Sequence, residues 1–169
     1  MIILGVDPGT AITGYGVIDA GPGPKARLVE CGVVRTPARD PLPVRLRAIR
    51  EGMVELLERH RPDAVAIEDV FYGKNLRTTV VLSHARGVIL LTVEEAGIPL
   101  GEYPPALVKK AVVGRGAAAK PQVGYMVAQL LRLSAPPSPA DAADGVAVAL
   151  AHHLLAGGAA ARGRRGQVA

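Results

Sequence analysis

Hydrophobic and polar residues alternate near the start of the chain in short runs that are typical of β-strands. Three runs rich in Val and Ile are separated by clusters of Gly and Pro, and each is too short for a helix. They lie at residues 2–6, 12–18 and 27–35. We therefore expect three antiparallel strands joined by turns.

The remainder of the chain alternates helical stripes of apolar residues with short apolar runs. The patterns predict helices at residues 43–60, 75–96, 105–113, 120–132 and 139–155, and strands at residues 63–70 and 98–103. A strand that follows a helical connection usually lies parallel to its predecessor in a buried sheet. The order predicts an α/β domain of the ribonuclease H-like fold, a five-stranded mixed sheet with helices on both faces.

The predicted helix of residues 75–96 carries apolar side chains over more of its circumference than one sheet contact requires. Val80, Leu82 and Ile89 are among them. We predict that the surplus apolar surface forms the interface of a homodimer. His84 and Arg86 interrupt the run, so we do not expect it to span a membrane.

Length and composition fit one globular domain. The chain has 169 residues, of which 49% are hydrophobic. We place the domain at residues 1–156 and expect residues 157–169 to be disordered, because GGAAARGRRGQVA has few apolar residues. The opening MIILGV is too short for a secretory signal and Cys31 is the only cysteine, so we expect a cytoplasmic protein without disulfides.

The net charge of +5 is compatible with a polyanionic partner. Arg162, Arg164 and Arg165 near the C-terminus account for much of the excess. Net charge indicates which partners a protein can attract and not which reaction it catalyses, so it leaves the function open.

Four carboxylates are predicted to converge at one place. Asp7 ends the first strand in GVDPGT, and Glu68 lies near the end of the fourth strand. If these strands are adjacent and parallel, their carboxylates meet at one end of the sheet. Asp141 and Asp144 are three residues apart on the last helix, so both project from one face. That face can be directed at the same strand ends.

Such a cluster requires a counter-charge. Two like charges ~4 Å apart repel by roughly 4 kcal/mol at an effective dielectric constant of 20. Oxygen ligands favour magnesium or manganese over zinc, and a pair of such ions can promote the hydrolysis of a phosphodiester. Taken singly, the acids also fit structural roles: Asp7 in a turn, Glu68 as a strand-end charge, and Asp141 beside a helix N-terminus.

The chain resembles the RuvC Holliday junction resolvase family in the order and spacing of five runs, up to about residue 155. The runs are ILGVDPGTAITGYGVI, AIEDVFYGKN, ARGV, VKKAVVGRGAAAK and PADAADGVAVALAHH. The resemblance implies that Asp7, Glu68, Asp141 and Asp144 bind two Mg²⁺ ions, which Mn²⁺ can replace, and that they cut four-way junction DNA. It further implies a homodimer that makes paired symmetric nicks in strands of like polarity, acting with the RuvAB branch-migration complex.

The resemblance also implies DNA contacts outside the carboxylate cluster. Phe71 lies three residues past Glu68, where the family places an aromatic wedge, and Tyr72 is beside it. Lys109 and Lys120 correspond to the family's lysines near the scissile strand. Packing under the following helix remains the alternative for the two aromatic residues, and an ordinary surface position remains the alternative for the two lysines.

Other basic residues are weaker candidates. Lys74 and Arg77 are expected to contact DNA, and Arg86 and Arg115 either hold phosphates or, for Arg86 within ARGV, have a structural role.

Neither of two neighbouring histidines, His152 and His153, has the spacing of a further metal ligand. We interpret both as structural or solvated residues.

Two positions depart from the common family pattern. Gly145 stands where alanine is usual, at a cost of roughly 1 kcal/mol in a helix interior. Lys110 stands where glutamine is frequent. They put in doubt the rigidity of the last helix and the detail of DNA contact, and they remove no carboxylate.

Two other functions are compatible with parts of the sequence. The strand ending in DPGT, followed by Gly14 and Gly16, also resembles the phosphate-binding start of sugar-kinase and actin-like phosphotransferases. Those proteins need two such domains, which 169 residues cannot supply. A non-catalytic binder of branched DNA is the third hypothesis, and the four intact carboxylates argue against it.

Overall fold

The computed structural model describes residues 1–69 and 76–165, and the side chains of residues up to 156. Its strands are β1 (Ile2–Asp7), β2 (Ile12–Ala20), β3 (Ala26–Arg35), β4 (Ala64–Glu68) and β5 (Leu100–Tyr103). Its helices are α1 (Leu42–His60), α2 (Leu76–Glu95), α3 (Pro105–Val113), α4 (Lys120–Leu131) and α5 (Ala140–Arg165). Each predicted element is present, and most ends agree within two residues.

The five strands form one mixed sheet in the order β3-β2-β1-β4-β5. The first three strands pair antiparallel, whereas β4 lies parallel to β1 and β5 lies parallel to β4. Val6 pairs with Ile67, so Asp7 and Glu68 follow at the same end of neighbouring parallel strands. The ribonuclease H-like arrangement and the predicted adjacency of these two strands are confirmed.

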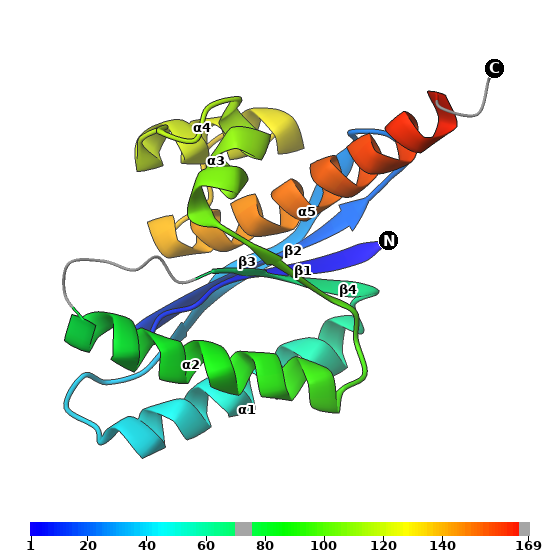
Figure 1. Cartoon of the computed structure of the whole chain (residues 1–169). Helices are drawn as coiled ribbons and strands as arrows, with labels where there is room; N and C mark the ends of the chain where they lie inside the picture. The colour runs from blue at the N-terminus through cyan, green and yellow to red at the C-terminus, as the bar shows by residue number, and fades with distance from the viewer. Residues whose placement is uncertain (70–75, 166–169) are drawn as a thin grey trace.

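Helices cover both faces of the sheet (Figure 1). On one face, α1 and α2 bury a cluster that includes Leu4, Val65 and Ile89. On the other face, α3, α4 and α5 bury a second cluster around Ile3 and Leu150. The sheet is therefore the middle layer of three, and α5 runs along it beneath α3 and α4 (Figure 1).

Glycines allow α5 to lie against the sheet at backbone distance. A Cβ atom on Gly14 of β2 would be 1.9 Å from the carbonyl oxygen of Asp141, and one on Gly145 would be 2.5 Å from the Cα atom of Tyr15. Any side chain at either position would push the two elements apart. The low helix propensity of glycine predicts a less rigid α5 at Gly145. In the structure it permits the close packing that holds this helix in place.

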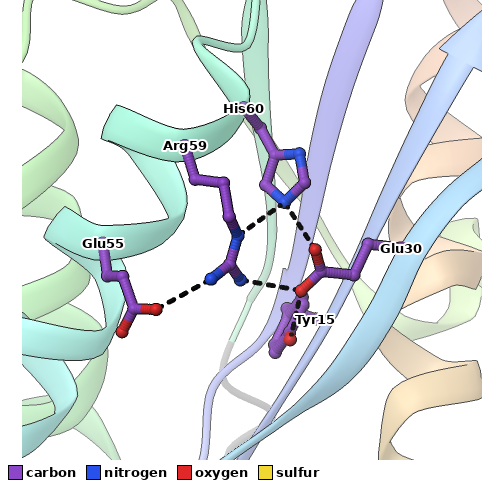
Figure 2. Close-up of polar contacts among 5 residues, drawn as sticks. All are labelled: Tyr15, Glu30, Glu55, Arg59 and His60. Carbon is purple, nitrogen blue, oxygen red and sulfur yellow. Dashed lines mark hydrogen bonds and ion pairs between the residues drawn. The ribbon is translucent and has the colours of Figure 1, made fainter.

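A polar network holds the C-terminal end of α1 against the sheet (Figure 2). Glu30 of β3 accepts hydrogen bonds from the Tyr15 hydroxyl at 2.8 Å and from Arg59 at 2.7 Å, and its other oxygen lies 2.9 Å from His60. Arg59 also pairs with Glu55 at 2.7 Å. Burial and the bond to Glu30 raise the pKa of Tyr15 to about 12, so this hydroxyl remains a donor.

The surface of α2 differs from the prediction at one residue. Ile89 is fully buried against the sheet, so it cannot belong to a dimer interface. Leu76, Val80 and Leu91 are instead the large apolar side chains that α2 exposes. Among the described residues, α2 is the one helix whose length and mean hydropathy would also allow it to cross a membrane, a property that core helices share.

The last helix is longer than the sequence pattern predicts. It continues past Leu155 to Arg165. Adding residues to an existing helix costs much less than starting one. The apolar stripe stops near Leu155, so periodicity alone does not mark where this helix ends.

Candidate active site

Asp7 and Glu68 lie side by side at the C-terminal ends of β1 and β4. Their carboxyl groups share a hydrogen bond. Burial raises the pKa of Glu68 to about 8, and the negative charge of Asp7 acts in the same direction. Burial also raises the pKa of Asp7 to about 6, although the hydrogen bond from Glu68 partly opposes this. The pair therefore holds one proton at neutral pH, and we place it on Glu68.

The first turns of α5 bring two more carboxylates to this place. Oxygen atoms of Asp7, Asp141 and Asp144 all lie within 4.8 Å of one another. The contact between Gly14 and Asp141 sets the height of α5 over the sheet, and Gly14 is also the residue that pairs with Asp7. The predicted convergence of the four acids is thus present in the folded chain.

Lys120, the first residue of α4, reaches into the cluster. Its ammonium group donates a hydrogen bond to Asp144 at 2.7 Å, and this bond raises the pKa of the lysine. The ammonium is thereby kept charged beside the carboxylates. It offsets part of their mutual repulsion.

Three of the four acidic residues border a cavity of about 200 Å³ that lies between the sheet end and α3, α4 and α5. Asp7, Glu68 and Asp144 contribute its acidic wall, and Lys109 and Lys120 its basic side. Val108 and Val123 add apolar surface to the lining. A cavity lined by both acidic and basic side chains suits a cation and an anionic substrate held together.

The donor set fits a divalent cation. All the candidate ligands are carboxylate oxygens, which suit magnesium and manganese. Three carboxylates lie together, the ammonium of Lys120 contacts one of them, and two of the four acids have raised pKa values because burial disfavours their charged forms. A bound cation would relieve this unfavourable electrostatic energy.

Some of the other residues singled out from the sequence lie away from this cavity. Arg77 is exposed in the first turn of α2, and Arg115 is exposed in the loop after α3. Arg86 pairs with Asp69 and Glu102, which supports a structural role. Phe71, Tyr72 and Lys74 lie outside the described residues, so their DNA contacts stay predictions.

The two histidines of α5 take structural positions. His152 is hydrogen-bonded to the hydroxyl of Tyr103 at 2.8 Å, and burial lowers the pKa of this histidine. His153 is buried. Neither is among the residues that border the carboxylate cavity.

Thr13 and Thr36, which sequence patterns did not single out, are both buried. Each hydroxyl bonds to the turn that follows Asp7. A threonine in a strand is ordinary by propensity, so the only available signal was its position near the DPGT turn.

Fold and site together define a class of protein. A carboxylate cluster at the ends of β1 and β4 and the start of α5, in a ribonuclease H-like sheet, offers the oxygen donors that a metal-dependent nuclease uses. Residues 3–152 match the family model described as "Crossover junction endodeoxyribonuclease RuvC". The chain belongs to this family.

Individual relatives agree with the family model over most of the chain. The protein from Parafrankia sp. (strain EAN1pec) named "Crossover junction endodeoxyribonuclease RuvC" is 53% identical over 164 residues, which are 97% of this chain and 92% of that one. The protein of the same name from Pelotomaculum thermopropionicum is 48% identical over 152 residues, covering 90% and 92%.

A solved structure has the same fold with a DNA substrate bound. The Thermus thermophilus RuvC in complex with a Holliday junction substrate superposes with a TM-score of 0.88 at 37% identity. The likeness covers 94% of this chain and 96% of that one. Family membership excludes the phosphotransferase alternative.

Proposed function

We propose that this protein resolves Holliday junctions in DNA recombination and repair by hydrolysing phosphodiester bonds at the carboxylate cluster. The observation that carries the proposal is the convergence of Asp7, Glu68, Asp141 and Asp144 at one end of the sheet, beside a cavity that Lys109 and Lys120 also line. Family membership and the Thermus thermophilus relative bound to a Holliday junction support the substrate.

The four carboxylates would hold two Mg²⁺ ions, for which Mn²⁺ can substitute. Such ions supply a nucleophilic water at neutral pH and stabilise the charge that develops on the phosphate. Glu68 and Asp7 must give up their shared proton when they become ligands, because metal ligands act in the deprotonated form. Metal binding is therefore linked to proton release in this site.

Lys109 and Lys120 have a different role in this proposal. Both lysines line the same cavity as the acids, where their ammonium groups can orient the phosphate of the strand to be cut. Lys120 bonds to Asp144 in the described structure. It is therefore already positioned at the edge of the metal site.

A homodimer is the proposed working unit. Leu76, Val80 and Leu91 lie along one stripe of α2, since positions 80 and 91 are eleven residues apart and a helix completes three turns in about that number. The opposite stripe, with Ile89 and Val93, is buried on the sheet. A two-fold pairing through the exposed stripe would present one carboxylate cluster to each of two strands of like polarity.

We also propose, from family membership, that the protein acts with the RuvAB branch-migration complex. In this proposal RuvAB moves the junction along the DNA before the paired cuts are made.

A cutting assay tests the function. The protein is incubated with Mg²⁺ and a synthetic four-way junction, with a linear duplex of the same sequence as control. We expect paired symmetric nicks in the junction and little cutting of the duplex. Equal cutting of both substrates would contradict structure selectivity. Binding of the junction without any cutting would favour the non-catalytic hypothesis.

A further inference from the structure

The turn that follows Asp7 has its carbonyl groups fixed from inside the protein. The Gly9 carbonyl accepts a hydrogen bond from the Thr13 hydroxyl at 2.7 Å. The Thr10 carbonyl accepts one from the Thr36 hydroxyl, and the Ala11 carbonyl accepts one from the Thr36 backbone N–H at 3.0 Å. Thr13 is fully buried and Thr36 is 6% exposed, so these three carbonyls face the interior.

The orientation of the carbonyls determines that of the neighbouring amides. In a planar trans peptide the C=O of one residue and the N–H of the next point in opposite directions. Inward carbonyls at Gly9 and Thr10 therefore turn the N–H groups of Thr10 and Ala11 toward the surface. Ala11 is exposed and Thr10 is half-buried, which agrees with this orientation.

The turn is rigid for further reasons. Arg45 of α1 donates from its Nε atom to the Thr36 hydroxyl at 3.1 Å, so the oxygen that holds Thr10 is itself held from a separate element. A Cβ atom on Gly9 would be 2.0 Å from the Ile12 carbonyl oxygen, so the backbone folds tightly at a residue without a side chain. Two adjacent amides held in this way form a preorganised anion site.

The surroundings favour a phosphate of DNA. Asp7 immediately precedes the turn, and Thr10 also borders a hollow of about 270 Å³ on the outer surface together with Arg77 and Leu82. The turn thus lies between the carboxylate cluster and an exposed arginine. A DNA strand whose scissile phosphate is at the cluster can place a neighbouring phosphate here.

We propose that the amides of Thr10 and Ala11 bind a phosphate next to the scissile one, and that Thr36 is the positioning residue that holds them outward. This inference rests on the proposed function, because it assumes a DNA strand across the carboxylate cluster. It assigns to the turn a contact that requires no basic side chain.

The first test pairs a surface substitution with a change in the DNA. Ala11→Glu sets a negative charge beside the proposed phosphate, and Ala11→Gln is its neutral control of similar size. Affinity for a four-way junction is measured without metal, using junctions that carry one neutral methylphosphonate at successive positions around the cutting site. We expect Ala11→Glu to bind the unmodified junction about tenfold more weakly than Ala11→Gln. At one position beside the scissile phosphate, the methylphosphonate should abolish this difference.

The second test examines Thr36. Thr36→Val removes the hydroxyl with little change in shape, and Thr36→Ser restores it. Thr92→Val is the matched control, since Thr92 is 3% exposed and its hydroxyl bonds to the Val88 carbonyl at 2.8 Å, away from the turn. In the unsubstituted protein and in Thr92→Val, a methylphosphonate at that position should weaken binding of the junction. In Thr36→Val it should not, and this variant alone should show a raised KM for cutting.

The outcomes separate the two proposals. Equal binding by the two Ala11 variants, or a difference that no methylphosphonate abolishes, would overturn the phosphate site while junction cutting stands. Retained phosphate sensitivity in Thr36→Val would overturn the role of Thr36. If Thr36→Val does not fold, the Ala11 pair decides the phosphate site, and Arg45→Met, which breaks the same chain of bonds, tests its support. An unsubstituted protein that neither prefers nor cuts four-way junctions would overturn the proposed function, and with it this inference.

Discussion

Glu68 and Asp7 illustrate how burial determines the state of single residues in this site. Both carboxyl groups lie at the end of a buried sheet, where the charged form is disfavoured, and they are close enough to share a proton. Asp144 is in contact with the ammonium of Lys120. Burial therefore favours the neutral forms of Glu68 and Asp7, whereas Asp144 has a cationic neighbour.

The raised pKa of Glu68 predicts the pH dependence of stability in the metal-free protein. A carboxyl whose pKa rises on folding from the ordinary 4.5 to about 8 favours the folded state below pH 4.5, and this contribution is lost as the pH rises toward 8. Glu68→Gln removes the titrating group. In EDTA, we expect the variant to be more stable than the unsubstituted protein at pH 8.5, by about 1 kcal/mol or more, and equally stable at pH 4.

Thermal unfolding followed by circular dichroism measures both proteins across this range. Glu51→Gln changes an exposed glutamate of α1 and should leave the pH dependence as it is. Parallel pH curves for Glu68→Gln and the unsubstituted protein would show that Glu68 is not protonated in the folded state.

The sequence predicts which acidic residues lie close together. It does not predict which other side chains contact the acids or the turn beside them. Asp7 and Glu68 could be paired because each ends a strand, and Asp141 and Asp144 because three residues separate them on a helix. The bond from Lys120 to Asp144 depends on how α4 lies over α5, and no local pattern encodes that. The support of the DPGT turn by Thr36 depends on the pairing of β2 with β3.

The packing of α5 on β2 controls the geometry of the cluster at the scale of elements. Both elements approach to backbone distance where Gly14 lies beneath Asp141. The same helix carries two of the four acids, so a small displacement of α5 moves two candidate ligands together. The close glycine contacts therefore fix the positions of the acidic residues as well as the packing of the core.

Gly14→Ala should therefore separate folding from cutting. The added methyl group meets the Asp141 carbonyl oxygen and must move the start of α5. A displacement on the order of 1 Å at a catalytic group costs about 100-fold in rate, and we expect a loss of that size in junction cutting with junction binding retained. Gly124→Ala is the control, because a Cβ atom there meets only the Pro136 side chain at 3.6 Å.

Cutting rates and melting temperatures of both variants check this prediction. A Gly14→Ala protein that cuts at the normal rate would show that the position of α5 tolerates change. Loss of cutting in both variants would point to general destabilisation.

The helices and strands were largely predictable from the sequence. Which of their side chains face the sheet and which face solvent was less predictable. Periodicity located every helix and strand because apolar residues mark the faces that become buried. It did not distinguish which apolar side chains of α2 face the sheet, so Ile89 was assigned to the wrong side. It also ended α5 at Leu155, where the apolar stripe stops, although the helix continues to Arg165.

At the scale of the whole molecule, the exposed apolar stripe of α2 is a surface that the described part of the chain leaves uncovered. Leu91 is 57% exposed and Val80 is 48% exposed, and both lie on the stripe proposed as the dimer interface. Leu91→Glu places a charge there without disturbing the buried side of the helix. We expect the dimer to dissociate at least about 100-fold more readily, leaving monomers that nick junctions without pairing their cuts.

Sedimentation at micromolar concentration measures the association. Val29→Glu is the control, since Val29 is 41% exposed on the edge strand β3, away from α2. A monomeric unsubstituted protein that still makes paired cuts would rule out the proposed dimer.

In the proposed function, the four carboxylates are required for cutting DNA, whereas contacts outside the cluster bind the junction. The most direct measurement is a parallel assay of junction binding and Mg²⁺-dependent cutting for Asp141→Asn and for Asp40→Asn, which alters an aspartate outside the cluster. We predict that Asp141→Asn binds the junction with unchanged affinity, or somewhat more tightly, and that its cutting falls by at least about 1000-fold. Asp40→Asn should cut normally. Substantial Mg²⁺-dependent cutting by Asp141→Asn would contradict the assignment of the site.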